Sequence, residues 1–177
     1  MKLVPTGIAG LTVVELDVFE DDRGSFREAY QQEKLRELGL ATPAAVQMNV
    51  AESKRGVIRG IHAEPWDKYV HVADGEVFAA LVDLRKSSDT FGAVETVTLG
   101  PRNAVFIPEG LGNSYAVLSD RALYTYLVPK HWSAGADYRA IAYDDAELGI
   151  DWPIPEDERI ISEKDRANPT LKEAFGG

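Results

Sequence analysis

From residue 46 onward the chain is a series of short segments rich in Val, Ile, Tyr and Phe, each bounded by Gly, Pro, Asn, Asp or Ser. The segments recur roughly every ten residues, a spacing typical of antiparallel sandwiches and barrels. No helical pattern separates them, although a doubly wound parallel sheet needs a helix in each crossover. The sequence therefore predicts an all-β fold, a jelly-roll β-barrel or sandwich with a few short peripheral helices.

The other segments fit around such a barrel, and we expect one domain covering residues 1–177. The segment LTVVELDVF near the N-terminus is rich in β-branched residues and predicts a strand. One helical pattern extends from Gln31 to Leu38, and Gly39 is placed to cap its C-terminus. The tail, residues 151–177, combines prolines with many charges. We expect it to pack on the barrel as a strap that ends in a short helix.

Charge and cysteine content exclude several functions. Asp and Glu number 29 against 19 Lys and Arg, and a formal net charge of −10 disfavours nucleic acid and anionic membranes as partners. The chain has no cysteine, which excludes disulfides, thiolate metal sites and cysteine nucleophiles. The N-terminal sequence shows no apolar run of signal-peptide or membrane-span length, so we expect a cytoplasmic protein.

Searches for common catalytic motifs are negative. The only histidines are His62, His71 and His131, and their spacing offers no set of metal ligands. The sequence has no GxGxxG before a helix, no P-loop and no GxSxG. We therefore expect neither a metal nor a cofactor, and acid–base chemistry is the reaction class that remains.

The segment GVIRGIHAEPWDK places an arginine, a histidine and a lysine along a half-buried strand pattern. Gly60 marks a kink, a bulge or a close backbone approach. Strand alternation puts Arg59 and Ile61 on one face of the sheet. It puts Ile58 and His62 on the other face. A lone histidine in an apolar run is more often a hydrogen-bonded core residue than a catalyst.

Six segments of the chain form an ordered set: DDRGSFREAY, VQMNVAESKRGVIRGIH, GEVFAALVDLRKSSDTFG, FIPEGLGNSY, LGIDWP and ISEKDRANP. In this order and spacing they resemble landmarks of the dTDP-4-dehydrorhamnose 3,5-epimerase family. The resemblance covers nearly the whole chain. It implies a cofactor-free jelly-roll cupin, usually a homodimer, that acts on a dTDP-linked 4-keto-6-deoxy sugar.

The resemblance assigns catalytic roles that fit the chemistry. Epimerisation beside a ketone needs a base, a donor for the enolate oxygen, and an acid on the other face of the ring. His62 matches the family's base, and Asp165 matches the carboxylate that orients it. Lys68 matches the lysine near the keto oxygen, and Tyr126 matches the acid. Tyr124, two residues earlier on the same face, competes for the acid's role.

The resemblance also implies a nucleotide-sugar site. Arg23 and Arg59 match arginines on the phosphate side, where guanidinium groups grip phosphate oxygens bidentately. In the family the segment that carries Arg23 reaches the neighbouring subunit, so we expect a homodimer with shared active sites. The other matching positions are Phe26 and Glu28 near the base, Gln47, Asn49 and Asn113 in the pocket, and Asp137 and Lys164.

The sequence departs from the family pattern near the expected sugar site. Asn113 stands in place of the usual histidine, and Ala63 and Glu64 stand where Phe and Gln are typical. The loop before Lys68 is also shorter.

Three hypotheses stay open: a full 3,5-epimerase, an epimerase of a single centre or of a related nucleotide sugar, and a non-catalytic sugar-nucleotide-binding cupin. Outside this resemblance, a tail residue such as Asp165 is usually a surface residue.

Overall fold

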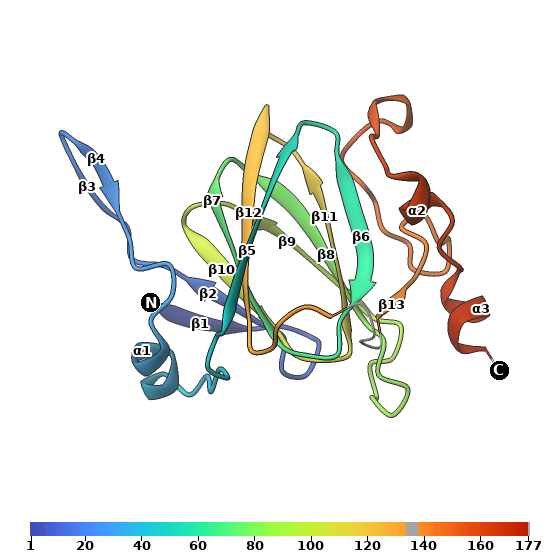
Figure 1. Cartoon of the computed structure of the whole chain (residues 1–177), viewed down its shortest axis with the longest axis horizontal. Helices are drawn as coiled ribbons and strands as arrows, with labels where there is room; N and C mark the ends of the chain where they lie inside the picture. The colour runs from blue at the N-terminus through green and yellow to red at the C-terminus, as the bar shows by residue number, and fades with distance from the viewer. Residues whose placement is uncertain (134–137, 177) are drawn as a thin grey trace.

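Two antiparallel sheets face each other and enclose the interior of the protein, as the computed structural model shows for residues 1–133 and 138–176 (Figure 1). The six-stranded sheet has the order β1 (Lys2–Pro5), β2 (Thr12–Glu15), β10 (Asn103–Ile107), β7 (Lys68–Asp74), β12 (Arg121–Val128) and β5 (Gln47–Lys54). The five-stranded sheet has the order β13 (Arg139–Ala140), β6 (Ile58–Ala63), β11 (Leu111–Val117), β8 (Val77–Asp83) and β9 (Val94–Leu99). The all-β sandwich predicted from the sequence is confirmed.

The interior is apolar at one end of the strands and polar at the other. On β7 the inward-facing Val70 and Val72 are buried in the main core, whereas Lys68 precedes them on the same face. On β11 the core residues Tyr115 and Val117 follow Asn113 in the same way. β7 and β11 belong to opposite sheets, and Lys68 and Asn113 line the same cavity, so the polar residues gather at one end of the barrel.

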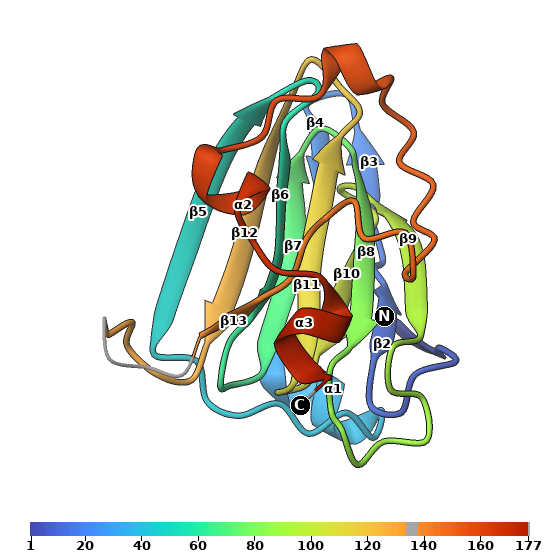
Figure 2. The same ribbon diagram turned by 90° about the vertical axis from the view of Figure 1, so that its right-hand side faces the viewer.

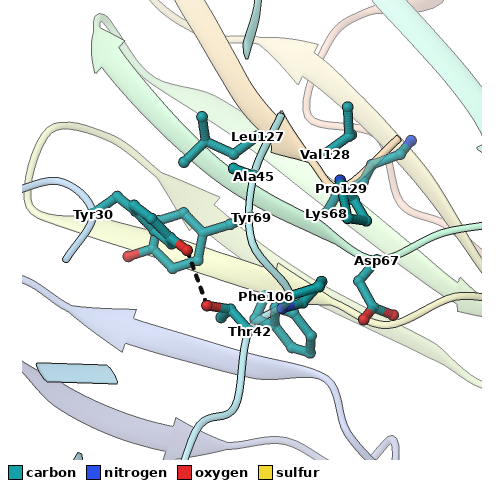
Figure 3. A pocket seen from close by; sticks show the side chains of 11 residues that line it. Tyr30, Thr42, Ala45, Asp67, Lys68, Tyr69, Phe106, Leu127, Val128 and Pro129 are labelled. Atoms are coloured by element: carbon teal, nitrogen blue, oxygen red, sulfur yellow. Dashed lines mark hydrogen bonds between the residues drawn. The ribbon is translucent and has the colours of Figure 1, made fainter. Parts of the chain in front are cut away.

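The predicted helix is present with bounds one residue inside the expected ones. α1 (Gln32–Glu37) is capped by Gln31, whose side chain accepts from the backbone of the first turn, and it buries Leu35. The segment after it packs on the outer face of the six-stranded sheet (Figure 3). Tyr30, just before α1, packs edge to face on Tyr69, with 5.0 Å between the ring centres. Its hydroxyl lies 3.0 Å from that of Thr42, in the segment after α1. The crevice between them, about 10 Å³, is no larger than a water molecule.

A hairpin of β3 (Phe19–Asp21) and β4 (Gly24–Phe26) projects from the barrel as an arm, on the side away from β6 (Figure 1). Phe19 and Phe26 are largely exposed on it. Of the described residues, no helix is long and apolar enough to cross a membrane.

The C-terminal segment crosses the outer face of the five-stranded sheet (Figure 2). Trp152 and Ile154 anchor it by packing into a buried cluster on that face. Further along, the backbone carbonyl of Ile160 accepts a 3.0 Å hydrogen bond from Ile58 on β6. A 3-10 turn (Glu156–Glu158) and two short helices, α2 (Glu163–Arg166) and α3 (Leu171–Phe175), complete the segment. The backbone bond to Ile58 fixes the position of α2 beside β6.

The prediction that Arg59 and His62 face opposite sides of the sheet is wrong. Both line one cavity, because the pairing of β6 with β11 shifts register between these two positions. Gly60 lies at the irregularity with φ +122°, and a Cβ there would lie 2.4 Å from that of Ser114. The expected bulge or close backbone approach at Gly60 is therefore confirmed.

Replacing Gly60 by Ala should lower the free energy of unfolding by about 3 kcal/mol, because it combines a left-handed backbone with a steric overlap. Gly24→Ala is a matched control: its φ is +130°, but nothing lies within 4 Å of the added Cβ. Urea unfolding of both variants measures the difference. Equal losses would show that the contact with Ser114 contributes nothing.

Candidate active site

A cavity of about 190 Å³ opens at the polar end of the barrel, between the two sheets. Strands from both sheets and one helix of the tail supply its walls. The lining residues are Ala51 on β5, Arg59 and His62 on β6, Glu64 in the β6–β7 loop, Lys68 on β7, Asn113 and Tyr115 on β11, Tyr124 and Tyr126 on β12, and Asp165 on α2. Six of the predicted site residues are thus brought together.

The imidazole of His62 is hydrogen-bonded to the carboxylate of Asp165, with 2.6 Å between Nε2 and Oδ1. Asp165 is only 5% exposed, although its neighbours in the tail are charged and exposed. Ser162 positions it, because its hydroxyl caps α2 by accepting from the Asp165 backbone N–H at 3.0 Å. The carboxylate favours the tautomer with a proton on Nε2 and leaves Nδ1 as the proton acceptor.

Lys68 lies in the cavity wall with 5% of its surface exposed. Its Nζ is 3.1 Å from a carboxylate oxygen of Glu64. Burial lowers the pKa of the Lys68 ammonium, and the Glu64 carboxylate opposes that shift. The cavity therefore holds a desolvated ammonium group that depends on one nearby carboxylate.

The two tyrosines of β12 differ in their environments. Tyr124 is fully buried, and its hydroxyl donates a 2.9 Å hydrogen bond to Oδ1 of Asn113. Tyr126 is only partly buried, and the Lys68 ammonium lies 5.6 Å from its ring centre. Burial, followed by the charge of Glu64, raises the pKa of Tyr126 to about 12. Tyr126 is therefore the better placed of the two to act on a molecule in the cavity.

Arg59 and two predicted residues of β5 lie along the cavity and its continuation. The Arg59 Nε donates to the hydroxyl of Ser53 at 3.1 Å, which fixes the guanidinium at the cavity wall. Gln47 and Asn49 alternate on the same face of β5 as the lining residue Ala51. They are hydrogen-bonded to each other at 2.8 Å. This face extends the site away from the main core.

Four other predicted residues, all among those that the structure describes, lie outside the cavity of this chain. Arg23 is 90% exposed on the β3–β4 arm and forms an ion pair with Asp21. Phe26 is exposed on the same arm, and Glu28 beyond it pairs with Lys34 of α1. Two more predicted residues complete the set: Lys164 is exposed on α2 next to Asp165, and Asp137 lies outside the described residues.

Sequence reasoning missed the lining residues Ala51, Glu64 and Tyr115, and also Ser53, which accepts a hydrogen bond from Arg59. Glu64 was noted only as a departure from the family pattern. Tyr115 is paired with Arg59 in the sheet, and its ring stacks on that of Tyr124 at 4.0 Å. The alternation of β5 places Ser53 on the face of Ala51, and this signal was available in the sequence.

The arrangement suits proton transfer. A histidine backed by a buried carboxylate, an ammonium group and a phenol line one cavity beside an arginine. Within the part of the chain that the structure describes, no group of three or more His, Cys, Asp or Glu side chains could hold a metal ion. Fold and site together define a jelly-roll protein equipped for acid–base chemistry on a small polar ligand.

The comparisons with known proteins identify its family. The family model for dTDP-4-dehydrorhamnose 3,5-epimerase matches residues 5–173. A curated protein of that name from Methanothermobacter thermautotrophicus is 39% identical, over 97% of this chain and 95% of its own length. The chain belongs to the dTDP-4-dehydrorhamnose 3,5-epimerase family, which confirms the resemblance found in the sequence.

Solved structures agree with this assignment. RmlC from Streptococcus suis, solved in complex with dTDP-D-xylose, superimposes with a TM-score of 0.91 and is 38% identical, covering 98% of this chain and 92% of its own. A double mutant of ChmJ, a 3'-monoepimerase from Streptomyces bikiniensis, was solved with dTDP. It gives a TM-score of 0.87 at 32% identity, covering 99% of this chain and 90% of its own. The fold predicted from the sequence is therefore that of these epimerases.

The two tyrosines should differ in their effect on stability. Tyr124→Phe leaves the buried Asn113 oxygen without its donor, so it should cost about 1–2 kcal/mol of unfolding free energy. Tyr126→Phe removes a hydroxyl at the cavity and should stay within about 0.5 kcal/mol of the original protein. Urea unfolding gives both values. A larger loss for Tyr126→Phe would contradict this division of roles.

Proposed function

We propose that this protein is a 3,5-epimerase that converts dTDP-4-dehydro-6-deoxyglucose into dTDP-4-dehydro-L-rhamnose, a step of deoxysugar biosynthesis. The observation that carries the proposal is the His62–Asp165 pair in one cavity with Tyr126 and Lys68. The name of the Methanothermobacter relative and the dTDP-sugar complex of the Streptococcus suis protein support it.

The reaction begins with removal of a proton from a carbon beside the ketone. Nδ1 of His62 accepts this proton, and Asp165 stabilises the imidazolium that forms. The electron pair moves onto the keto oxygen and gives an enolate. The Lys68 ammonium stabilises this developing negative charge, which is the largest electrostatic demand of the reaction.

The second step returns a proton to the carbon from the opposite face of the ring. Tyr126 is the acid, and its raised pKa keeps the phenol protonated at neutral pH. The phenol then regains a proton from solvent, and His62 loses its proton to solvent. Repeating the cycle at the second carbon beside the ketone inverts both centres.

The alternative of a single inverted centre has one specific observation in its favour. ChmJ is a 3'-monoepimerase with the same fold, so the architecture alone does not determine the number of centres. In this chain Asn113 accepts a hydrogen bond from Tyr124 in the cavity, where the family usually has a histidine. A non-catalytic cupin is the third hypothesis, and the same assay distinguishes all three.

Incubation with dTDP-4-dehydro-6-deoxyglucose (the 4-keto sugar) in heavy water should introduce deuterium at both ring carbons beside the ketone. NMR of the product measures the deuterium at each carbon. Deuterium at one carbon would support the monoepimerase, and none at either would contradict catalysis. His62→Asn should slow exchange by about a thousandfold. Tyr126→Phe should leave exchange but block inversion, because His62 returns a solvent deuteron to the original face.

We also propose that the active protein is a homodimer whose sites are shared. The cavity of about 190 Å³ is smaller than a typical pocket for a ligand of drug size, about 300–1,000 Å³, so it accommodates the sugar rather than the whole nucleotide sugar. Arg23 and Phe26 stand exposed on an arm that projects from the barrel on the side away from β6 (Figure 1), and neither lines the cavity of its own chain. A partner's arm supplies the missing phosphate and base contacts. The cytoplasmic location remains a prediction.

Mixing two inactive variants tests the sharing. In a heterodimer of Arg23→Ala and His62→Asn chains, one site contains both intact residues and the other contains neither. After subunit exchange, activity should recover to about a quarter of the original value, because one site in four is intact. Arg36→Ala, which changes an exposed arginine on α1, is the control and should keep full activity. No recovery, with dimers confirmed, would place each site within one chain.

A further inference from the structure

Glu64 enters the mechanism above only through its effect on the pKa of Tyr126, yet its carboxylate lies in the wall of the cavity beside Lys68. It is the first residue of the loop that joins β6 to β7, and these strands belong to different sheets. The loop therefore crosses from one sheet to the other beside the cavity, which Glu64 lines. Its short length brings Glu64 and Lys68 together across the turn, with 3.1 Å between the charged atoms.

The Glu64 carboxylate is held in place by a second contact. The indole Nε1 of Trp66 donates a 2.9 Å hydrogen bond to the same oxygen that faces Lys68. Trp66 is buried, so its indole is a fixed donor. The loop itself is fastened to the barrel, because Asp67 accepts a 2.8 Å hydrogen bond from the backbone of Glu109. The distance between the carboxylate and the ammonium is thus set by the fold.

We propose that Glu64 is a positioning residue that keeps Lys68 protonated and aimed along the cavity wall, so that the ammonium is present when the enolate forms. This inference rests on the proposed function, since Lys68 acts there as the enolate-stabilising group. An ion pair buried at this depth is strongly coupled, and loss of one partner leaves the other uncompensated. Glu64 acts through Lys68 and not on the sugar.

The charges that surround Lys68 make Glu64 its principal stabiliser. Arg59 on β6 carries a positive charge that disfavours the Lys68 ammonium, and His62 on the same strand becomes positive during the reaction. Tyr126 from β12 stays neutral, and Asp165 on α2 is committed to His62. Glu64 is the carboxylate in direct contact with the ammonium.

The sign of the effect follows from linkage. Burial already lowers the pKa of Lys68, and the Glu64 charge counteracts it. Without that charge the pKa of Lys68 falls further, so the ammonium is lost at a lower pH. Deprotonated Lys68 donates poorly to an enolate. Activity should therefore decline earlier on the alkaline side.

The experiment compares Glu64→Gln with the unmodified protein in the deuterium-exchange assay from pH 6 to pH 10. In Glu64→Gln the alkaline limb of the pH profile should move to lower pH. The activity of the variant, relative to that of the unmodified protein, should fall about tenfold between pH 7 and pH 9. Glu109→Gln removes an exposed carboxylate outside the cavity and should leave the profile unchanged. Glu64→Asp retains the charge and should restore much of the original profile.

A second measurement is independent of catalysis. NMR titration of ¹⁵N-labelled lysine side chains, with Lys68 assigned from a Lys68→Arg variant, should show Lys68 losing its proton at lower pH in Glu64→Gln. Trp66→Phe removes the donor to the Glu64 carboxylate and should shift the Lys68 titration in the same direction by a smaller amount. This variant tests the inference if Glu64→Gln fails to fold. An unchanged Lys68 titration would overturn the inference. Absence of exchange in the unmodified protein would instead refute the proposed function while the titration still tests Glu64.

Discussion

One hydrogen bond, between His62 and Asp165, joins residues 103 positions apart in the chain and gives the cavity its reactive group. Its geometry depends on how the C-terminal strap lies against the barrel strand that carries His62. The Ile58–Ile160 backbone bond brings the strap alongside β6, and Ser162 caps the short helix that presents the carboxylate. A helix of four residues has little stability of its own, so packing against the barrel must hold it.

The cavity exists because an apolar pattern stops partway along several strands. Towards one end of β7 and β11 the inward-facing side chains are polar instead of apolar. Burying a polar side chain costs free energy unless it finds a hydrogen-bond or ion-pair partner. Each does: Lys68 pairs with Glu64, Asn113 with Tyr124, and the strap carboxylate with His62. The core at the apolar end supplies the stability that supports this polar end.

The sequence revealed the architecture better than the details of the site. Period-two patterns and turn residues are local signals, so the strands and α1 could be predicted, the helix to within one residue at each end. Arg59 and His62 were assigned to opposite faces because alternation holds only along an unbroken ladder, and the register shift near Gly60 breaks it. The burial of Asp165 is set by tertiary packing, so only the family resemblance indicated its role.

The electrostatics of the site explain how an acidic protein can serve an anionic ligand. Net charge governs long-range attraction, whereas recognition depends on the groups within a few ångströms of the ligand. In the cavity Lys68 is balanced by Glu64, and Arg59 is the arginine among the lining residues, which the proposed function assigns to the diphosphate. A nucleoside diphosphate carries more negative charge than one guanidinium neutralises. In the proposed dimer, the exposed Arg23 of a partner's arm is the second arginine that shares this charge.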